Sequence, residues 1–171
     1  EGKGERPLFM TPLARRFLRY GIGIPAGFIL LASFATWIGL RGSLPRLDGE
    51  IPVDGLAASV TIERDAAGVP VIRGESRADV ARATGYAHAQ DRWFQMDLLR
   101  RTGGGELSAL LGAGLLDADR HIRPHQFRRR AVEALAALDA RDRDVLEAYA
   151  AGANAALAAM RARPFEYLLL R

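Results

Sequence analysis

The stretch from Gly85 to Arg101 constrains the fold more than any other part of the chain, because it predicts one long helix with apolar side chains on two sides. At 100° per residue, the two roughly opposite stripes consist of Val80, Ala83, Ala87, Phe94 and Leu98, and of Tyr86, Ala89, Trp93 and Met96. A surface helix needs only one stripe, so two stripes predict a helix packed between two layers. Gly85 costs about 1 kcal/mol relative to Ala inside a helix, and we expect close packing of another backbone to offset this cost.

Residues at both ends predict where this helix begins and ends. Ser76 is a typical N-cap residue, and Asp79 stands three positions later, where a capping box has its acid. Three glycines, Gly103 to Gly105, end the helical pattern. We therefore expect the helix to begin near Arg77 and to stop at these glycines.

His88 and Asp91 lie one turn apart on this helix, and Asp91 falls within the first apolar stripe. An ionised carboxylate there is costly unless a cation or several N–H donors meet it, so Asp91 is expected to have a partner. The pair is either an acid/base or metal pair, or a buried polar brace between layers. The brace is favoured because no nucleophile accompanies the two residues.

Residues 20–40, read YGIGIPAGFILLASFATWIGL, carry no charge. At 1.5 Å per residue this run spans about 31 Å, which matches the hydrocarbon core of a bilayer. A buried helix of a soluble protein is the alternative, and the unbroken run with Trp37 near its end makes it the weaker one. Small residues at Ser33 and Ala35 could permit signal cleavage, but the apolar run continues beyond them and favours an uncleaved anchor.

Charges on the two sides of this run predict its orientation. Arg15, Arg16 and Arg19 precede it and outweigh Arg41 and Arg46, so the positive-inside rule places the N-terminus in the cytoplasm and the rest outside.

The predicted organisation has four parts. Residues 1–19 form a basic cytoplasmic N-terminus, 20–40 a transmembrane anchor or uncleaved signal, 41–57 a linker rich in Gly and Pro, and 58–171 the globular part.

A β-hairpin is predicted at the start of the globular part. Residues 58–64 alternate between apolar and polar side chains, as in a half-buried strand. The turn Asp65-Ala66-Ala67-Gly68 places Gly68 where a positive φ is needed, and residues 69–73 return as a second strand. Pro70 removes one N–H donor, which indicates an edge strand or a bulge.

Further along, a helix is predicted to run toward Leu138. Asp117, His121 and His125 have i, i+4, i+8 spacing and could place three metal ligands on one face. Pro124 interrupts the helical hydrogen bonds between the two histidines, so a solvated or helix-bracing role is favoured and no metal site is assigned.

Four arginines, Arg123 and Arg128 to Arg130, form a local basic run. A phosphate or nucleic-acid site is one interpretation, but no aromatic residues are interleaved for stacking. A solvated or acid-paired helix face is therefore favoured, and nucleic acid is not expected as a partner.

Asp139, with Asp142 three residues later, predicts the N-terminus of another helix. Its expected core face consists of Val145, Tyr149, Gly152, Ala153, Ala156, Leu157 and Met160. Small residues around Gly152 permit close helix packing, and Pro164 ends the helix. The apolar residues 165–170 begin one further element.

Composition limits the class of protein. The 171 residues are 49% hydrophobic and 26% charged, enough for one modest domain beside a targeting segment. A formal net charge of +4 gives no reason to expect a polyanionic partner. Cysteine is absent, which excludes disulfides and thiolate metal sites.

Several motifs resemble, in order and spacing, the start of the α chain of the penicillin acylase family, and the similarity runs from about Leu47 to the end of the chain. They are Ile62 to Asp65, Gly68 to Ile72, Gly85 to Arg92, Phe94 to Met96, Gly105 to Leu107, and Leu111 with Gly112. The family consists of amidohydrolases of the N-terminal nucleophile type. No single tripeptide carries the resemblance, which depends on the whole series.

The resemblance implies a precursor that cuts itself into two chains. The β chain of the family begins with a Ser whose hydroxyl attacks the amide carbonyl while its own α-amino group acts as the base. Ser33, Ser43, Ser59, Ser76 and Ser108 are followed by Phe, Leu, Val, Arg and Ala, so none has the Ser-Asn start of that chain. The family's acyl-pocket residues and a calcium-binding Glu would lie beyond Arg171. Catalytic, substrate-binding and metal residues are therefore assigned as none.

The predicted fold class is α+β: a mainly helical part with a short N-terminal β-hairpin, belonging to an αββα N-terminal nucleophile hydrolase and preceded by one transmembrane helix. The predicted protein is the α-chain portion of an exported amidohydrolase acting on non-peptide amides of acylated amines, such as penicillins or acyl-homoserine lactones. Its expected partners are a β chain from the same precursor, the acyl-amide substrate and the membrane, through residues 20–40, with the globular part periplasmic or extracellular. Calcium is the expected cofactor of the complete enzyme.

The alternative is a membrane-tethered helical interaction module, or an inactive fragment, without catalysis. If the chain is the α-chain portion of the enzyme, too few segments are available to form two layers, so the stripe of Tyr86, Trp93 and Met96 is expected to stay uncovered without the β chain. The globular part alone is then expected to be molten or to aggregate.

Overall fold

The computed structural model describes residue 13 and residues 16–42 and 44–170. Two compact units make up the chain, Glu1–Gly42 and Ser43–Arg171.

In the first unit, a π-helix, η1 (Phe17–Gly23), is followed directly by α2 (Ile24–Gly42). Pro25 has no N–H to donate to the carbonyl group four residues earlier, and the helix type changes beside it. Tyr20–Gly42 is 23 residues long and apolar enough to cross a membrane, although a signal sequence would meet the same criterion. The predicted helix is confirmed, and its insertion into a membrane stays a prediction.

The second unit begins with the predicted β-hairpin. Strands β1 (Thr61–Arg64) and β2 (Pro70–Arg73) pair antiparallel, with Thr61 opposite Arg73 and Arg64 opposite Pro70. Asp65 closes the turn, because its Oδ1 accepts hydrogen bonds from the backbone N–H groups of Ala67 at 2.9 Å and Val69 at 2.8 Å. Gly68 has the predicted positive φ of 79°.

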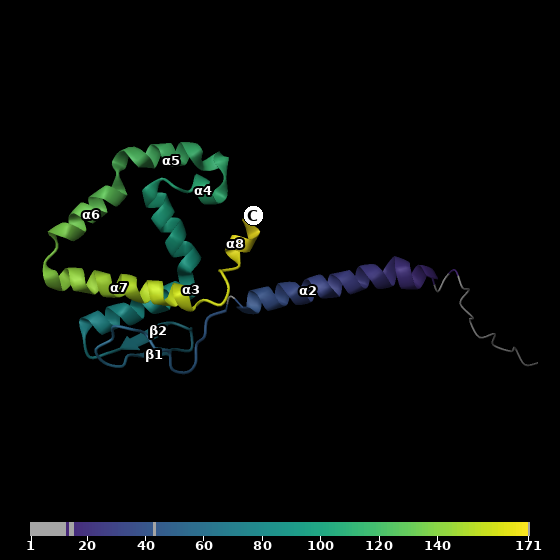
Figure 1. Ribbon diagram of the computed structural model, residues 1–171, viewed down its shortest axis with the longest axis horizontal. Helices are drawn as coiled ribbons and strands as arrows, with labels where there is room; N and C mark the ends of the chain where they lie inside the picture. Colours follow the sequence, from purple (N-terminus) through teal and green to yellow (C-terminus); the bar gives the residue numbers. More distant parts are fainter. Residues whose placement is uncertain (1–12, 14–15, 43, 171) are drawn as a thin grey trace, which may run out of the picture. The chain divides into compact units, whose positions relative to one another are not determined.

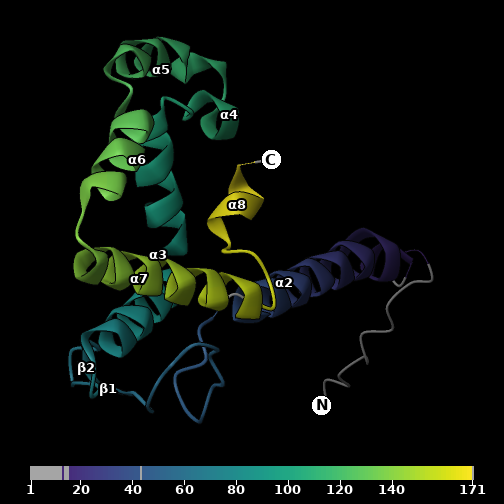
Figure 2. The same ribbon diagram turned by 60° about the vertical axis from the view of Figure 1, so that its left-hand side comes forward.

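Helix α3 (Arg77–Gly104) has the predicted ends. The Ser76 side chain accepts a hydrogen bond from the Asp79 N–H at 3.0 Å, and Gly105 ends the helix with a φ of 63°. One feature was not predicted: Arg92 has φ −139° and ψ 27°, so the helix is bent there rather than continuous. Figures 1 and 2 show its two halves running in different directions.

Helix α7 (Ala140–Ala159) packs against the first half of α3. Its N-terminus is capped as predicted by Asp139, which accepts a hydrogen bond from the Asp142 N–H at 2.8 Å. A Cβ atom on Gly85 would lie 2.0 Å from the carbonyl oxygen of Tyr149, and one on Gly152 would lie 1.9 Å from that of Arg82. The close backbone approach expected at both glycines is confirmed.

The connection from α3 to α7 differs from the single helix that was predicted. It contains α4 (Ser108–Leu111), a 3₁₀ turn η2 (Ala113–Leu115), α5 (Leu116–Ile122), a second 3₁₀ turn η3 (Arg123–His125) and α6 (Phe127–Ala137) (Figure 1). The break between α5 and α6 coincides with Pro124 and with Gln126, which has a positive φ of 52°. A short helix α8 (Glu166–Leu169) follows α7.

The second apolar stripe is covered, contrary to expectation. Tyr86 is only 8% exposed and packs with Ala89, Ala153 and Ala156, while Trp93 and Met96 lie half-buried beside them. The missing cover comes from the segment predicted to be a linker, since Ile51 and Val53 pack against this cluster. The backbone carbonyl of Arg46, in the same segment, accepts a hydrogen bond from Gln90 at 2.7 Å.

Candidate functional site

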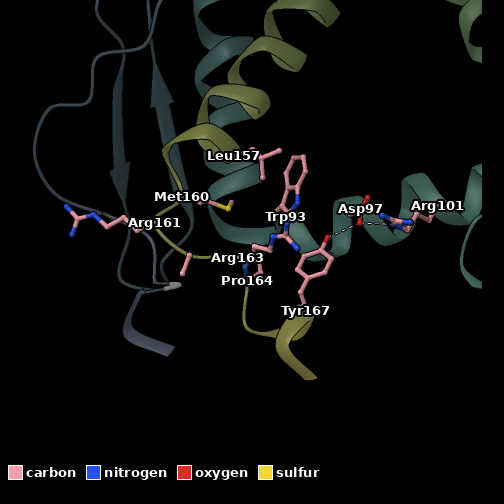
Figure 3. Close-up of a pocket in the computed structure, with 10 residues that line it drawn as sticks. Trp93, Asp97, Arg101, Leu157, Met160, Arg161, Arg163, Pro164 and Tyr167 are labelled. Atoms are coloured by element: carbon pink, nitrogen blue, oxygen red, sulfur yellow. Dashed lines mark hydrogen bonds and ion pairs between the residues drawn. The ribbon is translucent and has the colours of Figure 1, made fainter. Parts of the chain in front are cut away.

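A pocket of about 530 Å³ lies where the second half of α3, the end of α7 and α8 meet (Figure 3). The lining residues are Trp93, Asp97, Arg101, Leu157, Met160, Arg161, Ala162, Arg163, Pro164 and Tyr167. Trp93 directly follows the bend of α3 at Arg92. Ala162, Arg163, Pro164 and Tyr167 follow the end of α7 at Ala159. This volume is in the range of small-molecule sites.

Asp97 is the polar centre of the pocket and is 7% exposed. Its Oδ1 accepts hydrogen bonds from Arg100 at 2.8 and 3.1 Å, and its Oδ2 accepts one from Arg101 and one from the Tyr167 hydroxyl, both at 2.8 Å. Burial alone would raise the pKa of Asp97, but the hydrogen bonds from Arg101, Arg100 and Tyr167 outweigh it and hold this pKa below its usual value. The carboxylate therefore stays ionised and fully paired.

Tyr167 fastens α8 to α3. Besides its bond to Asp97, its ring packs edge-on against Phe94, with 5.2 Å between the ring centres. Burial and the hydrogen bond to Asp97 raise the pKa of Tyr167 to about 12, so it remains a neutral donor. The role of Asp97 could not be predicted from local sequence, because its partner Tyr167 is 70 positions away.

Two other buried carboxylates, Asp79 and Asp119, accept hydrogen bonds from backbone N–H groups and from a serine hydroxyl near the start of a helix. Asp79 accepts hydrogen bonds from the Ala57 N–H at 2.9 Å and the Ser76 hydroxyl at 2.8 Å, and these bonds lower its pKa. Asp119, 2% exposed, accepts from the N–H groups of Leu107 and Ser108 at 2.8 and 2.9 Å. Asp119 was missed, because the groups that it caps precede it by about a dozen residues.

His88 and Asp91 have separate partners. Nδ1 of His88 lies 3.0 Å from the Tyr149 hydroxyl of α7, and Asp91 forms an ion pair with Arg64 of β1 at 2.9 Å. The predicted cation partner of Asp91 is confirmed. Its predicted full burial is wrong, because water still reaches the ion pair, in which the Asp91 side chain is 25% and the Arg64 side chain 21% exposed. His88 is exposed. The pair joins α3 to two neighbouring elements, as the bracing interpretation requires.

The candidate metal ligands on α5 are not brought together. Asp117 pairs with Arg120 at 2.9 Å, and His125 stacks on Phe127 after the helix has ended. Among the residues that the structure describes, no group of three or more His, Cys, Asp or Glu could hold a metal ion.

The basic run is partly paired with acids, as favoured. Arg128 forms an ion pair with Glu106 at 2.7 Å, and Arg129 lies 3.5 Å from Glu133. Arg123 donates a hydrogen bond to the Gly105 carbonyl at 3.0 Å.

Of the serines considered as nucleophiles, Ser43 lies outside the described residues. Ser76 and Ser108 donate hydrogen bonds to the buried carboxylates of Asp79 and Asp119. Both hydroxyls are therefore already engaged.

The chain can be assigned to a protein family. The family model for penicillin amidase matches residues 59–171, so the chain belongs to this family of amidohydrolases.

Individual relatives agree with this assignment. The chain is 42% identical over 131 residues to penicillin acylase 2 proenzyme of Pseudomonas sp. (strain SE83), covering 77% of this chain and 17% of that protein. It is 38% identical over 149 residues to the acyl-homoserine lactone acylase QuiP of Pseudomonas fluorescens (strain Pf0-1), covering 86% of this chain and 18% of the relative. The chain thus spans less than a fifth of these curated relatives.

A solved structure shares the fold. The thermostable penicillin G acylase from Alcaligenes faecalis, in its tetragonal form, superposes with a TM-score of 0.59 at 37% sequence identity, over 66% of this chain and 62% of that chain. The mainly helical arrangement with one short β-hairpin is therefore that of a penicillin acylase.

Proposed function

We propose that this chain is the N-terminal portion of the α chain of an exported amidohydrolase that cleaves non-peptide amides of acylated amines. The observation that carries the proposal is the shared fold and 37% identity with a penicillin G acylase. Relatives named as penicillin and acyl-homoserine lactone acylases support these two substrate classes.

The nucleophile is proposed to lie on a β chain released from the same precursor, within an αββα N-terminal nucleophile fold. There the hydroxyl of an N-terminal Ser attacks the amide carbonyl, and its free α-amino group takes the proton. Within the described residues, Ser76 and Ser108 donate hydrogen bonds to buried carboxylates, which leaves them unsuited to this role. The contribution of this chain is a frame of α3, α7 and the hairpin.

Calcium, which the family resemblance implies, does not fit the described part of this chain. Asp79, Asp97 and Asp119 are the buried carboxylates, and each is already met by N–H, O–H or guanidinium donors. We therefore propose that residues elsewhere in the complete enzyme would hold the ion.

The apolar Tyr20–Gly42 helix is proposed to anchor the enzyme to the membrane, with the second unit in the periplasm or outside the cell. Its support is the length and composition of the helix and the excess of arginines before it.

The test uses the complete precursor, expressed in a bacterial host and purified. Incubation with benzylpenicillin and with an acyl-homoserine lactone should release a primary amine from at least one of them, measured with an amine-reactive dye. The purified protein should consist of two chains, and N-terminal sequencing should find Ser at the start of the second. Replacing this Ser by Ala should abolish cleavage and hydrolysis, whereas an uncut precursor without amine release would overturn the proposal.

One observation favours the alternative, a membrane-tethered interaction module. Helix α6 has no buried residue, and its Phe127, Val132 and Leu135 are 47%, 63% and 37% exposed. Such a face can bind another protein. Capture of a separate partner by a precursor that is neither cut nor active would support this alternative.

A further inference from the structure

We propose that the pocket between α3, α7 and α8 binds an amphipathic monocarboxylate, with Arg163 holding the carboxylate and Trp93, Leu157 and Met160 contacting its apolar body. The proposal adds a ligand site to the proposed function and depends on it only for the source of the ligand. Hydrolysis of R–CO–NH–R′ by one water yields R–COOH and H₂N–R′, so an amidohydrolase of acylated amines produces such acids.

The walls of the pocket are apolar on one side and polar on the other. Trp93 and Met160 are half-buried, and Leu157, which is 39% exposed, lies beside them with Pro164. They form an apolar lining on one side, and Met in particular adapts to ligands of different shape. Tyr167 and Asp97 are tied to each other, so they fix the opposite, polar side of the pocket (Figure 3).

The charged residues of the pocket are mostly basic. Three arginines and one aspartate line the pocket. Asp97 is already compensated by Arg100 and Arg101, each bonded to it at 2.8 Å. Among the described residues no carboxylate pairs with Arg161 or Arg163, so the pocket has an excess of positive charge that a ligand anion could neutralise.

The side chains of Arg161 and Arg163 point in different directions. In Figure 3, the guanidinium group of Arg163 points toward Trp93 and Tyr167, whereas the side chain of Arg161 points away from the other residues. A planar guanidinium presents two parallel N–H donors, which match the two oxygens of a carboxylate. Arg163 is therefore placed to hold a carboxylate in the pocket, whereas the guanidinium group of Arg161 is directed away from it.

The test measures binding of radiolabelled octanoate by equilibrium dialysis against the 171-residue chain in lipid nanodiscs. Empty nanodiscs give the amount that partitions into lipid. We expect saturable binding with one site per chain, weakened at least tenfold in Arg163→Gln by loss of a charge-assisted pair. Arg161→Gln is the matched control and should bind as the unaltered chain does. Octanamide, which has the same tail without the charge, should compete at least tenfold more weakly than octanoate.

Two results would overturn the proposed site. Equal losses of octanoate binding in Arg161→Gln and Arg163→Gln would show only general attraction of an anion to a basic surface. Absence of saturable octanoate binding would show that the pocket does not bind the carboxylate. Thermal unfolding followed by circular dichroism should be unchanged in both variants, because both arginines are exposed. Failure of the proposed function is distinguishable, since octanoate binding requires no hydrolysis. A precursor without amidase activity whose 171-residue chain binds octanoate through Arg163 would keep the pocket and remove the enzyme.

Discussion

At the residue scale, the buried carboxylates show which interactions hold the second unit together. Asp97 joins two arginines of its own helix to Tyr167 of α8, and Asp119 joins α5 to the start of α4. Asp91, which the sequence placed in an apolar stripe, has a side chain that is 25% exposed and pairs with Arg64, whose side chain is 21% exposed. Because water still reaches this pair, replacing Asp91 by Leu should lower the free energy of unfolding by about 1–2 kcal/mol, less than the several expected for a fully buried charge. Urea unfolding of the variant measures this difference.

Asp97→Asn should lower the free energy of unfolding by about 2 kcal/mol at neutral pH, because the amide cannot accept from Arg100, Arg101 and Tyr167 as an ionised carboxylate does. The folded-state pKa of Asp97 is lowered, so its stabilisation is fully present above the unfolded pKa of about 3.9 and is lost as pH falls through the lower folded pKa. Urea unfolding at several pH values should show a smaller acid loss in the variant. Asp117→Asn is the control, since that side chain is 92% exposed, and an equal effect in both variants would contradict the role assigned to Asp97.

At the scale of elements, local signals were predictable and the effects of distant contacts were not. Ser76, Asp139 and Gly68 act on groups within a few residues, so the helix starts and the hairpin turn followed from sequence. The bend at Arg92 has no Pro or Gly to announce it, and a helical wheel assumes that none exists. The pocket depends on that bend and on Tyr167, which is why sequence analysis found no site there.

At the contact between α3 and α7, replacing glycine by alanine should lower the stability, whereas the same replacement away from the contact should not. Gly85→Ala and Gly152→Ala would each place a methyl group within 2.0 Å of a backbone carbonyl oxygen, so the helices must separate and stability should fall by about 1–3 kcal/mol or more. Gly103 lies in α3, as Gly85 does, but a Cβ atom added to it would have nothing within 4 Å. Gly103→Ala should therefore be neutral or stabilising by up to about 1 kcal/mol. Thermal unfolding of the three variants checks this order. Equal midpoints for Gly85→Ala and Gly103→Ala would contradict the close approach.

At the scale of the whole molecule, the assignments of the two units depend on different observations. Family membership covers residues 59–171, and the packing of Ile51 and Val53 extends the folded part into the preceding segment. Because this segment covers Tyr86, we expect the second unit to unfold cooperatively. This expectation replaces the sequence-based one, which was a molten or aggregating globular part. In the first unit, the whole apolar window of the helix is exposed, so its role depends on length, composition and flanking charge. A bilayer is the environment in which such a surface is stable.

Topology is therefore the property of the whole molecule to test. Alkaline phosphatase, which is active only outside the cytoplasm, should be active when fused after Gly55 in a bacterial host, because the positive-inside rule predicts a cytoplasmic N-terminus from the arginines before the apolar helix. Replacing Leu30 and Leu31 by Arg should abolish this activity, since each Arg at the centre of the span costs about 3 kcal/mol on insertion. Replacing both by Val preserves an apolar span and should leave the activity unchanged. A fusion to β-galactosidase at the same position should be inactive, and the reverse pattern of the two reporters would place the second unit in the cytoplasm and exclude an exported enzyme.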